Sequence, residues 1–142
     1  MSKSNLPAAT RRFVNGRANG YCEYCRSHED CGSGPFNVEH IIPEFNGGTN
    51  DVENLAYSCN GCNGHKFTKT FAIDPVSEQT AALFNPRTQV WNEHFRWDET
   101  STIILGHTPS GRATVEALKM NRTQLVNLRR AMVLLGIHPP VN

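Results

Sequence analysis

Three stretches decide the fold: CEYC at residues 22–25, VEHIIP at residues 38–43 and CNGC at residues 59–62. Two thiolates separated by two residues can bind one metal ion from a single tight turn, and two such turns supply the four ligands of a tetrahedral zinc site. Disulfides are the alternative, but residues 1–20 contain no apolar run that would serve as a secretory signal, so we expect a reducing, cytoplasmic location. Cys31 lies outside both pairs and is interpreted as a loop residue. The predicted ligands of a structural Zn²⁺ are Cys22, Cys25, Cys59 and Cys62.

The length and charge of the chain limit its class. Its 142 residues fit one domain or a small core with an extension, and no stretch approaches the ~18 consecutive apolar residues that cross a bilayer. We therefore expect no membrane partner. The net charge is +1, but residues 1–35 carry +2, residues 36–109 carry −5 and residues 110–142 carry +4. A polyanion would meet basic flanks, and the acidic centre suits a divalent cation, although acidic loop residues are often only solvated.

The segments around the two cysteine pairs show a simple order of expected elements. A short basic helix precedes the first pair, and an alternating apolar and polar stretch predicts a strand that ends at His40. Two glycines then favour a turn, a second strand returns, and the second pair opens a helix. The predicted ranges for helix, strand, turn, strand and helix are 7–18, 36–39, 46–48, 54–57 and about 60–70.

The second half of the chain predicts an extension of the core. An aromatic-rich run over residues 84–105 with polar turns indicates short strands, and Thr108-Pro109 is a good start for a helix to about Leu118. Apolar residues at helical spacing beyond it predict a second helix. We therefore predict an α+β fold, with a zinc-braced core over residues 1–72 and a strand and two-helix extension over residues 73–142 that packs on it.

Basic side chains on the two predicted C-terminal helices form a candidate contact surface for a nucleic-acid backbone. A merely solvated basic face is an equal alternative, because charged residues usually cover the outer faces of helices. The candidate backbone contacts are Arg112, Lys119, Arg122, Arg129 and Arg130.

Residues 20–68 resemble the HNH endonucleases, whose fold is the ββα-metal fold. The position directly after the second cysteine pair is Asn63 instead of histidine, which matches the HNN subtype, as in zinc-containing phage junction resolvases. Glu39 stands where the family usually has aspartate, so the carboxylate is kept with a longer reach. The motifs that carry the resemblance are Cys22-x-x-Cys25, residues 38–43, Gly47-Gly48, Glu53-Asn54-Leu55, Cys59-x-x-Cys62-Asn63 and Lys66.

The resemblance and the chemistry of phosphodiester hydrolysis assign roles to four residues. Cleavage needs a base that activates water and charge stabilisation at the phosphate and the departing 3′ oxygen. We assign His40 as the general base, and Glu39 and Asn63 as ligands of a catalytic Mg²⁺ or Mn²⁺. Asn54 is expected to pin the loop and orient His40, or to act only as a hydrogen-bonding turn residue. The expected products carry 5′-phosphate and 3′-hydroxyl ends.

Two further residues have open alternatives. His65 and Lys66 could contact a phosphate or the metal, and both could equally be surface residues.

The predicted function is a metal-dependent DNA endonuclease, either monomeric or homodimeric. A junction-specific resolvase would share the site but needs a dimer to cut two strands. A catalytically silent zinc module that binds nucleic acid would need neither His40 nor Asn63.

Overall fold

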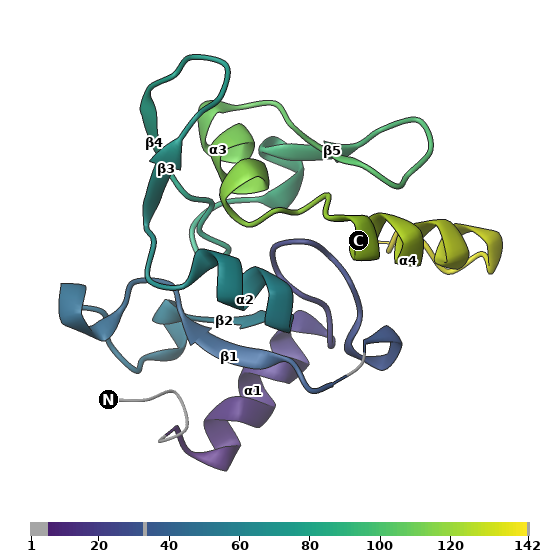
Figure 1. Cartoon of the computed structure of the whole chain (residues 1–142). Coiled ribbons are helices and arrows are strands. Elements are labelled where there is room, and N and C mark those ends of the chain that lie inside the picture. The colour runs from purple at the N-terminus through teal and green to yellow at the C-terminus, as the bar shows by residue number, and fades with distance from the viewer. Residues whose placement is uncertain (1–5, 33, 142) are drawn as a thin grey trace. The chain divides into compact units, whose positions relative to one another are not determined.

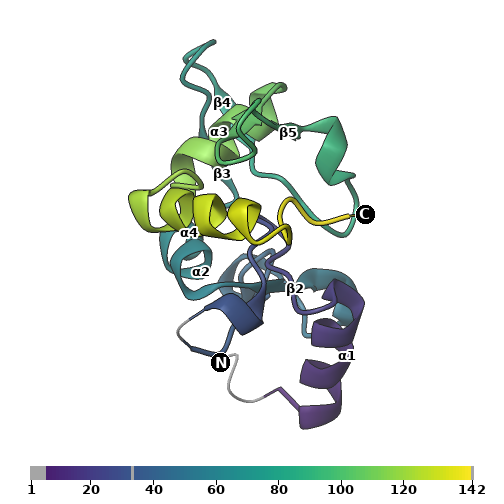
Figure 2. The ribbon, with the colours of Figure 1, turned by 90° about the vertical axis from the view of Figure 1, so that its right-hand side faces the viewer.

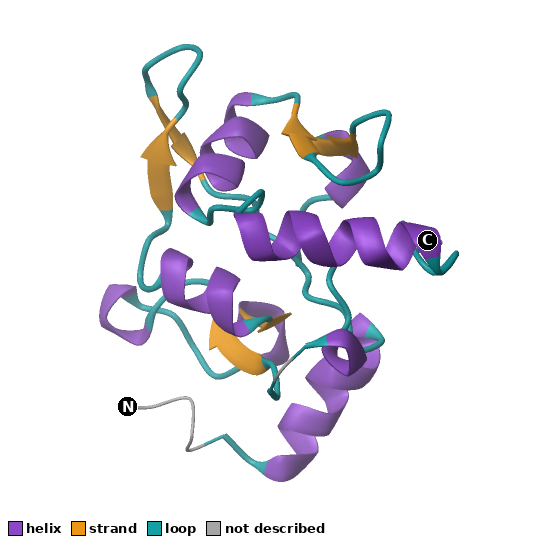
Figure 3. Cartoon of the chain, turned by 45° about the vertical axis from the view of Figure 1, so that its right-hand side comes forward, coloured by secondary structure: helices purple, strands orange, loops and turns teal. Residues whose placement is uncertain are grey.

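The chain folds into two compact units, each built from helices and short two-stranded antiparallel sheets (Figure 3). The computed structural model describes residues 6–32 and 34–141, so the outermost residues of the predicted ranges 1–72 and 73–142 lie outside it. The mixed helix and strand content confirms the predicted α+β class. Unit 1 comprises Met1–Thr70 and Asn85–Gln89, and unit 2 comprises Phe71–Phe84 and Val90–Asn142.

Unit 1 is a β-hairpin placed between two helices. The strands β1 and β2 pair antiparallel, with His40 opposite Leu55 at one end and Asn37 opposite Ser58 at the other. Figures 1 and 2 show α1 on one side of this hairpin and α2 on the other. The elements are α1 (Ala8–Ala18), η2 (Glu29–Cys31), β1 (Asn37–His40), η3 (Glu44–Asn46), η4 (Val52–Asn54), β2 (Leu55–Ser58) and α2 (Asn60–Lys66).

Helix α1 covers the hairpin through its apolar side. The extended backbone of Pro7 precedes the helix, and Asn19 ends it in the left-handed conformation with φ 56°. Val14 from the helix is fully buried and packs in one cluster with strand residues. Burial of this apolar surface stabilises the position of α1 against the strands. The cluster consists of Leu6, Val14, Val38, Leu55 and Tyr57, with Ala18 and Phe36 at its edge.

Helix α2 is shorter than the sequence predicts. Cys59 is its N-cap, and its Sγ accepts a hydrogen bond from the backbone N–H of Cys62. The prediction that the helix continues to about residue 70 is wrong, because it ends at Lys66. Phe67 has φ 50° and ψ −117°, a backbone conformation that a helix cannot include. The catalytic candidates of this helix therefore lie within two turns of the cysteine that starts it.

Unit 2 contains two hairpins and two helices. Helix α3 lies beside the β3–β4 hairpin, as Figures 1 and 2 show. The longest helix has 12 residues, and no helix in the described part of the chain is both long and apolar enough to cross a membrane. The elements are β3 (Phe71–Ile73), β4 (Thr80–Ala82), η5 (Trp91–Glu93), β5 (Phe95–Trp97), β6 (Ile104–Gly106), α3 (Pro109–Ala117) and α4 (Thr123–Leu134).

The predicted start of α3 is confirmed. Thr108 is the N-cap, its Oγ1 accepts from the N–H of Gly111 at 2.9 Å, and Pro109 opens the first turn. Behind this helix the aromatic run forms the core of unit 2, where the rings of Phe84 and Phe95 pack edge to face with centroids 5.2 Å apart. The aromatic residues are thus structural in unit 2.

Candidate functional site

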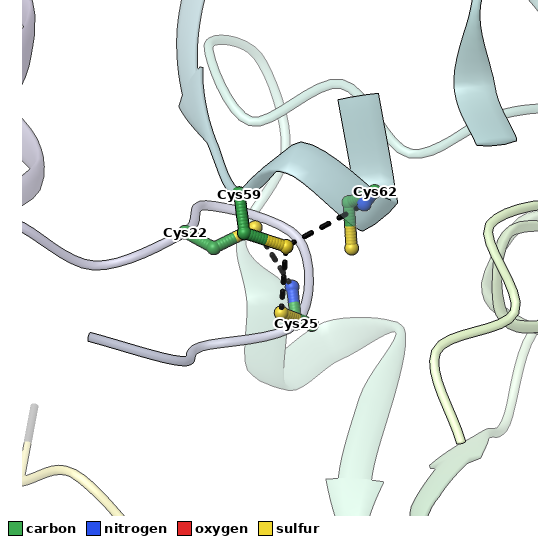
Figure 4. Close-up of side chains that lie close together, drawn as sticks. All are labelled: Cys22, Cys25, Cys59 and Cys62. Atoms are coloured by element: carbon green, nitrogen blue, oxygen red, sulfur yellow. Dashed lines mark hydrogen bonds between the residues drawn. The ribbon is translucent and has the colours of Figure 1, made fainter. Parts of the chain in front are cut away.

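Four cysteines from two distant turns meet inside unit 1 (Figure 4). All four are buried, and their Sγ atoms lie within 4.8 Å of one another. The Sγ atoms of Cys25 and Cys59 are 3.7 Å apart. This is too long for a disulfide, whose sulfurs are about 2 Å apart, and it matches the separation of about 3.8 Å expected for two thiolates on one tetrahedral Zn²⁺ with bonds of about 2.3 Å.

In each turn a backbone N–H donates a hydrogen bond to a cysteine sulfur, which favours the thiolate form that binds a cation. The N–H of Cys25 donates to the Sγ of Cys22, and the N–H of Cys62 donates to the Sγ of Cys59. Burial raises the pKa of the Cys22 thiol, whereas hydrogen bonds from the neighbouring cysteines lower the pKa of the Cys59 thiol. A Zn²⁺ ion would offset the negative charge of the thiolates that the two turns bring together. The buried four-cysteine cluster is therefore a site able to hold structural zinc, and Cys31 is no member of it.

His40 stands at the last position of β1, where the hairpin opens into its loop. Its side chain is largely buried, and its Nε2 lies 2.7 Å from the Oδ1 of Asn50. The strand therefore places the histidine, and a residue of the following loop holds its ring.

The Asn54 side chain joins the two ends of that loop. Its Nδ2 donates to the carbonyls of Ile42 and Thr49, each at 2.9 Å, and its Oδ1 accepts from the N–H of Ile42 at 2.9 Å. Gly48 lies so close that an added Cβ would sit 1.7 Å from the Ile42 carbonyl oxygen, so only glycine fits. All these bonds join the two ends of the loop beside His40.

Glu39 points into the protein instead of into solvent. Its side chain is almost completely buried, its Oε2 accepts from the Tyr24 hydroxyl at 2.7 Å, and its Oε1 lies 3.3 Å from the Nζ of Lys66. Burial, with the neighbouring Glu39 carboxylate second, raises the pKa of the Tyr24 hydroxyl, which keeps it protonated as a donor. The carboxylate that the sequence assigns to a divalent ion is thus already paired within the fold.

Lys66 is a buried structural cation, which corrects the expectation that it meets a phosphate or solvent. Its side chain is 1% exposed, and its Nζ donates to the carbonyl of Ile41 at 2.9 Å and to that of His40 at 3.4 Å. With Glu39 it joins α2 to the end of β1. The sequence did not indicate this because a lysine among polar residues on a short helix usually faces water.

Replacing Lys66 by methionine is expected to destabilise unit 1 by about 3–5 kcal/mol, because it leaves the buried Glu39 carboxylate without its cation. Urea unfolding of the full chain measures the loss. Lys69→Met is the matched control, since Lys69 is an exposed lysine just beyond the same helix. The double variant Glu39→Gln with Lys66→Met should recover part of the loss. Equal stability of the Lys66 and Lys69 variants would contradict the pairing.

Asn63 and His65 occupy different faces of α2. Asn63 is half-buried, and its backbone N–H donates to the Cys59 carbonyl at 2.9 Å in the first turn. His65 is exposed, and its carbonyl accepts from the Nζ of Lys69 at 3.0 Å. The roles of both side chains in binding a metal or a phosphate stay predictions.

Two of the five predicted backbone contacts in unit 2 are structural instead. Arg112 donates through Nε and Nη2 to the two carboxylate oxygens of Asp74, each at 2.9 Å, and Asp74 is completely buried. This pair holds the pKa of Asp74 well below its usual range. Arg129 is 3% exposed and donates to the carbonyls of Thr102 and Met120 at 2.9 and 2.7 Å. Neither guanidinium is presented to a phosphate, which corrects these two expectations.

The other three basic residues differ in exposure. Lys119 is more than half exposed and lies 3.3 Å from Glu116. Arg122 is half-buried and donates to the carbonyl of Lys119, whereas Arg130 is exposed and donates to Asn127 at 2.9 Å. These three residues remain candidates for contact with a polyanion.

Sequence reasoning missed two residues of the site. Tyr24 lies inside the first cysteine pair and reaches Glu39, and Asn50 lies in the hairpin loop and reaches His40. The spacing of residues in the sequence does not indicate either contact, because each joins residues that only the folded hairpin brings together.

Comparison with family models supports the same region. Residues 22–69 match the family described as HNH endonuclease. The chain contains an HNH endonuclease domain. No significant match was found among curated proteins or solved structures. The HNH domain holds the four-cysteine cluster, as expected for a zinc-binding member, and it indicates nuclease activity on nucleic acids.

Proposed function

We propose that the protein is a metal-dependent DNA endonuclease in which His40 is the general base. The observation that carries the proposal is the setting of His40 within the HNH domain. The histidine ends β1 beside a loop that Asn54 ties at both ends, and one of its ring nitrogens is held by Asn50. A base that must take a proton from water in one direction needs such fixed orientation.

The protein's own groups would act as follows. The other ring nitrogen of His40, Nδ1, takes a proton from the attacking water as its oxygen approaches phosphorus. Asn54 keeps the loop, and hence the histidine, in place through its bonds to Ile42 and Thr49. The buried pair of Lys66 and Glu39 holds α2 against the strand that carries the base. As the new P–O bond forms, the bond between phosphorus and the 3′ oxygen breaks and that oxygen takes a proton from solvent, which leaves a 5′-phosphate and a 3′-hydroxyl.

Glu39 and Asn63 are the proposed ligands of a divalent cation. A carboxylate and an amide oxygen are the donors that Mg²⁺ and Mn²⁺ take in proteins, so the donor set fits. Because the Glu39 carboxylate also accepts from Tyr24 and pairs with Lys66, a bound ion would share it with these two groups. When bound, the cation would offset the charge that develops on the phosphate and the departing oxygen.

Two alternative functions can be distinguished by the nucleic acids that the protein binds or cuts. A resolvase with the same chemistry would leave plasmid intact and cut a four-way junction, and it would be a dimer because two strands must be cut. A silent zinc module would bind DNA with an affinity that falls with salt and would cut nothing. The presence of His40 together with Asn54 and Asn63 in the HNH domain favours an enzyme over such a module.

The test is incubation of the purified full chain with supercoiled plasmid in Mg²⁺, Mn²⁺ or EDTA, with zinc quantified in each sample. We expect nicked or linear DNA in the presence of a divalent ion and none with EDTA. Nicked product would indicate cutting of one strand and linear product cutting of both. A four-way junction, single-stranded DNA and RNA form the second panel. Zinc-loaded protein that leaves every one of these substrates intact would overturn the proposal.

A further inference from the structure

We infer that Asn50 is a positioning residue for His40, and that its amide oxygen selects the imidazole tautomer that a general base requires. The inference rests on the proposed role of His40 in cleavage. It assigns a function to a loop residue that is not among the sequence motifs that carry the family resemblance.

The contact between the two side chains sets the proton position. The Oδ1 of Asn50 lies 2.7 Å from the Nε2 of His40. An amide oxygen has lone pairs and no hydrogen, so it can only accept, and Nε2 must carry the proton. In a neutral imidazole the lone pair then resides on Nδ1. Across residues 6–32 and 34–141, Nε2 is the one ring nitrogen of His40 with a hydrogen-bond partner, so Nδ1 is left for water.

The backbone on both sides of Asn50 is fixed, so its side chain is held at the required place. The Thr49 carbonyl accepts from the Nδ2 of Asn54 at 2.9 Å, and the N–H of Asp51 donates to the Thr49 hydroxyl at 3.2 Å. The N–H of Asn54 donates to the Asp51 carbonyl at 2.8 Å. Asn54 therefore acts on His40 through Asn50, which explains how a residue without a bond to the imidazole can orient it.

The position of the ring makes this contact decisive. His40 is largely buried and Asn50 is exposed, so their hydrogen bond lies at the boundary between the folded hairpin and solvent. Rotation of the imidazole about its second side-chain torsion would exchange a nitrogen for a carbon at the Asn50 oxygen and lose the bond. One hydrogen bond thus sets both the ring orientation and the tautomer.

The experiment compares three variants of the full chain. Asn50→Leu removes the acceptor at similar size, Asn50→Asp keeps it, and Asn46→Leu is the matched control from an exposed asparagine in the same loop. Two-bond ¹H–¹⁵N correlation spectra of the ¹⁵N-histidine-labelled protein, recorded with the ring neutral, report the tautomer directly. We expect the Nε2–H form of His40 in the wild type and in the Asn50→Asp and Asn46→Leu variants, and a mixture in Asn50→Leu.

Cleavage kinetics supply the second readout. Asn50→Leu should lower kcat about 10- to 100-fold with little change in KM, as removal of a partner that orients a site residue does. Asn50→Asp should recover most of kcat, whereas its negative charge near the phosphate raises KM. A loss from general unfolding would not be rescued by Asp.

The outcomes separate this inference from the proposed function. A wild-type His40 in the Nδ1–H form, or equal spectra for Asn50→Leu and Asn46→Leu, would overturn the role of Asn50 even if the protein cuts DNA. An Nε2–H tautomer that depends on Asn50 in a protein that cuts no substrate would keep the contact and reject the nuclease role of His40.

Discussion

His40→Ala is expected to slow cleavage of DNA by about 10²- to 10⁴-fold, because it removes the proposed general base. The substitution should leave the fold intact. The Lys66 ammonium bonds the backbone carbonyl of residue 40, which alanine retains, and the strand pairing with Leu55 is also a backbone contact. Cleavage of plasmid under single-turnover conditions measures the loss, and zinc content and circular dichroism verify the fold.

His107→Ala is the matched control for that variant. His107 is an exposed histidine of unit 2 whose Nε2 contacts the Asn92 carbonyl at 3.3 Å, far outside the HNH domain in sequence. Its replacement should leave cleavage unchanged. If His40→Ala cuts at the wild-type rate, the assignment of His40 as the base is wrong.

Cys59→Ser is expected to lower zinc content and thermal stability together. Cys59 is one of four buried sulfurs, so its replacement removes one ligand from the metal site, whereas the serine hydroxyl can still accept the N-cap hydrogen bond of α2. We expect the melting temperature of the HNH domain to fall by at least about 10 °C. Each kcal/mol lost from the free energy of unfolding lowers the melting temperature by about 4–8 °C for a domain of this size. Calorimetry and metal analysis of the same sample test this.

Cys31→Ser serves as its control, because Cys31 lies outside the cluster. It removes a thiol without removing a ligand, so zinc stoichiometry and melting temperature should stay as in the wild type. A Cys59→Ser protein with unchanged zinc and unchanged melting temperature would exclude the cluster as a structural brace.

Local patterns in the sequence predicted the elements of unit 1 well. Short-range rules control these features: a left-handed residue ends α1, alternation marks β1, and a glycine with positive φ turns the chain at Gly47. The end of α2 was missed because Phe67 adopts a conformation that its own sequence does not favour. Propensity describes the usual case, and a single residue with positive φ is enough to end a helix.

The charged residues show where local reasoning fails. Lys66, Arg112 and Arg129 were expected on outward faces and are each held by carboxylates or carbonyls inside the fold. Long side chains of this kind can reach either solvent or the interior. A long basic side chain turns inward only where a hydrogen-bond acceptor lies in the interior of the protein. That acceptor belongs to a segment distant in the sequence.

By itself, the sequence determined which four cysteines form the cluster and which family residues 22–69 match. Each Cys-x-x-Cys pair needs only the local geometry of its own turn to offer two sulfurs to an ion, and the motif around His40 is contiguous. Only the tertiary structure decided the partners of the site residues, namely Tyr24 and Lys66 on Glu39 and Asn50 on His40. The physical reason is that a ligand set within a short turn is fixed by covalent spacing, whereas a buried polar group takes whichever partner the folded backbone brings within hydrogen-bond distance.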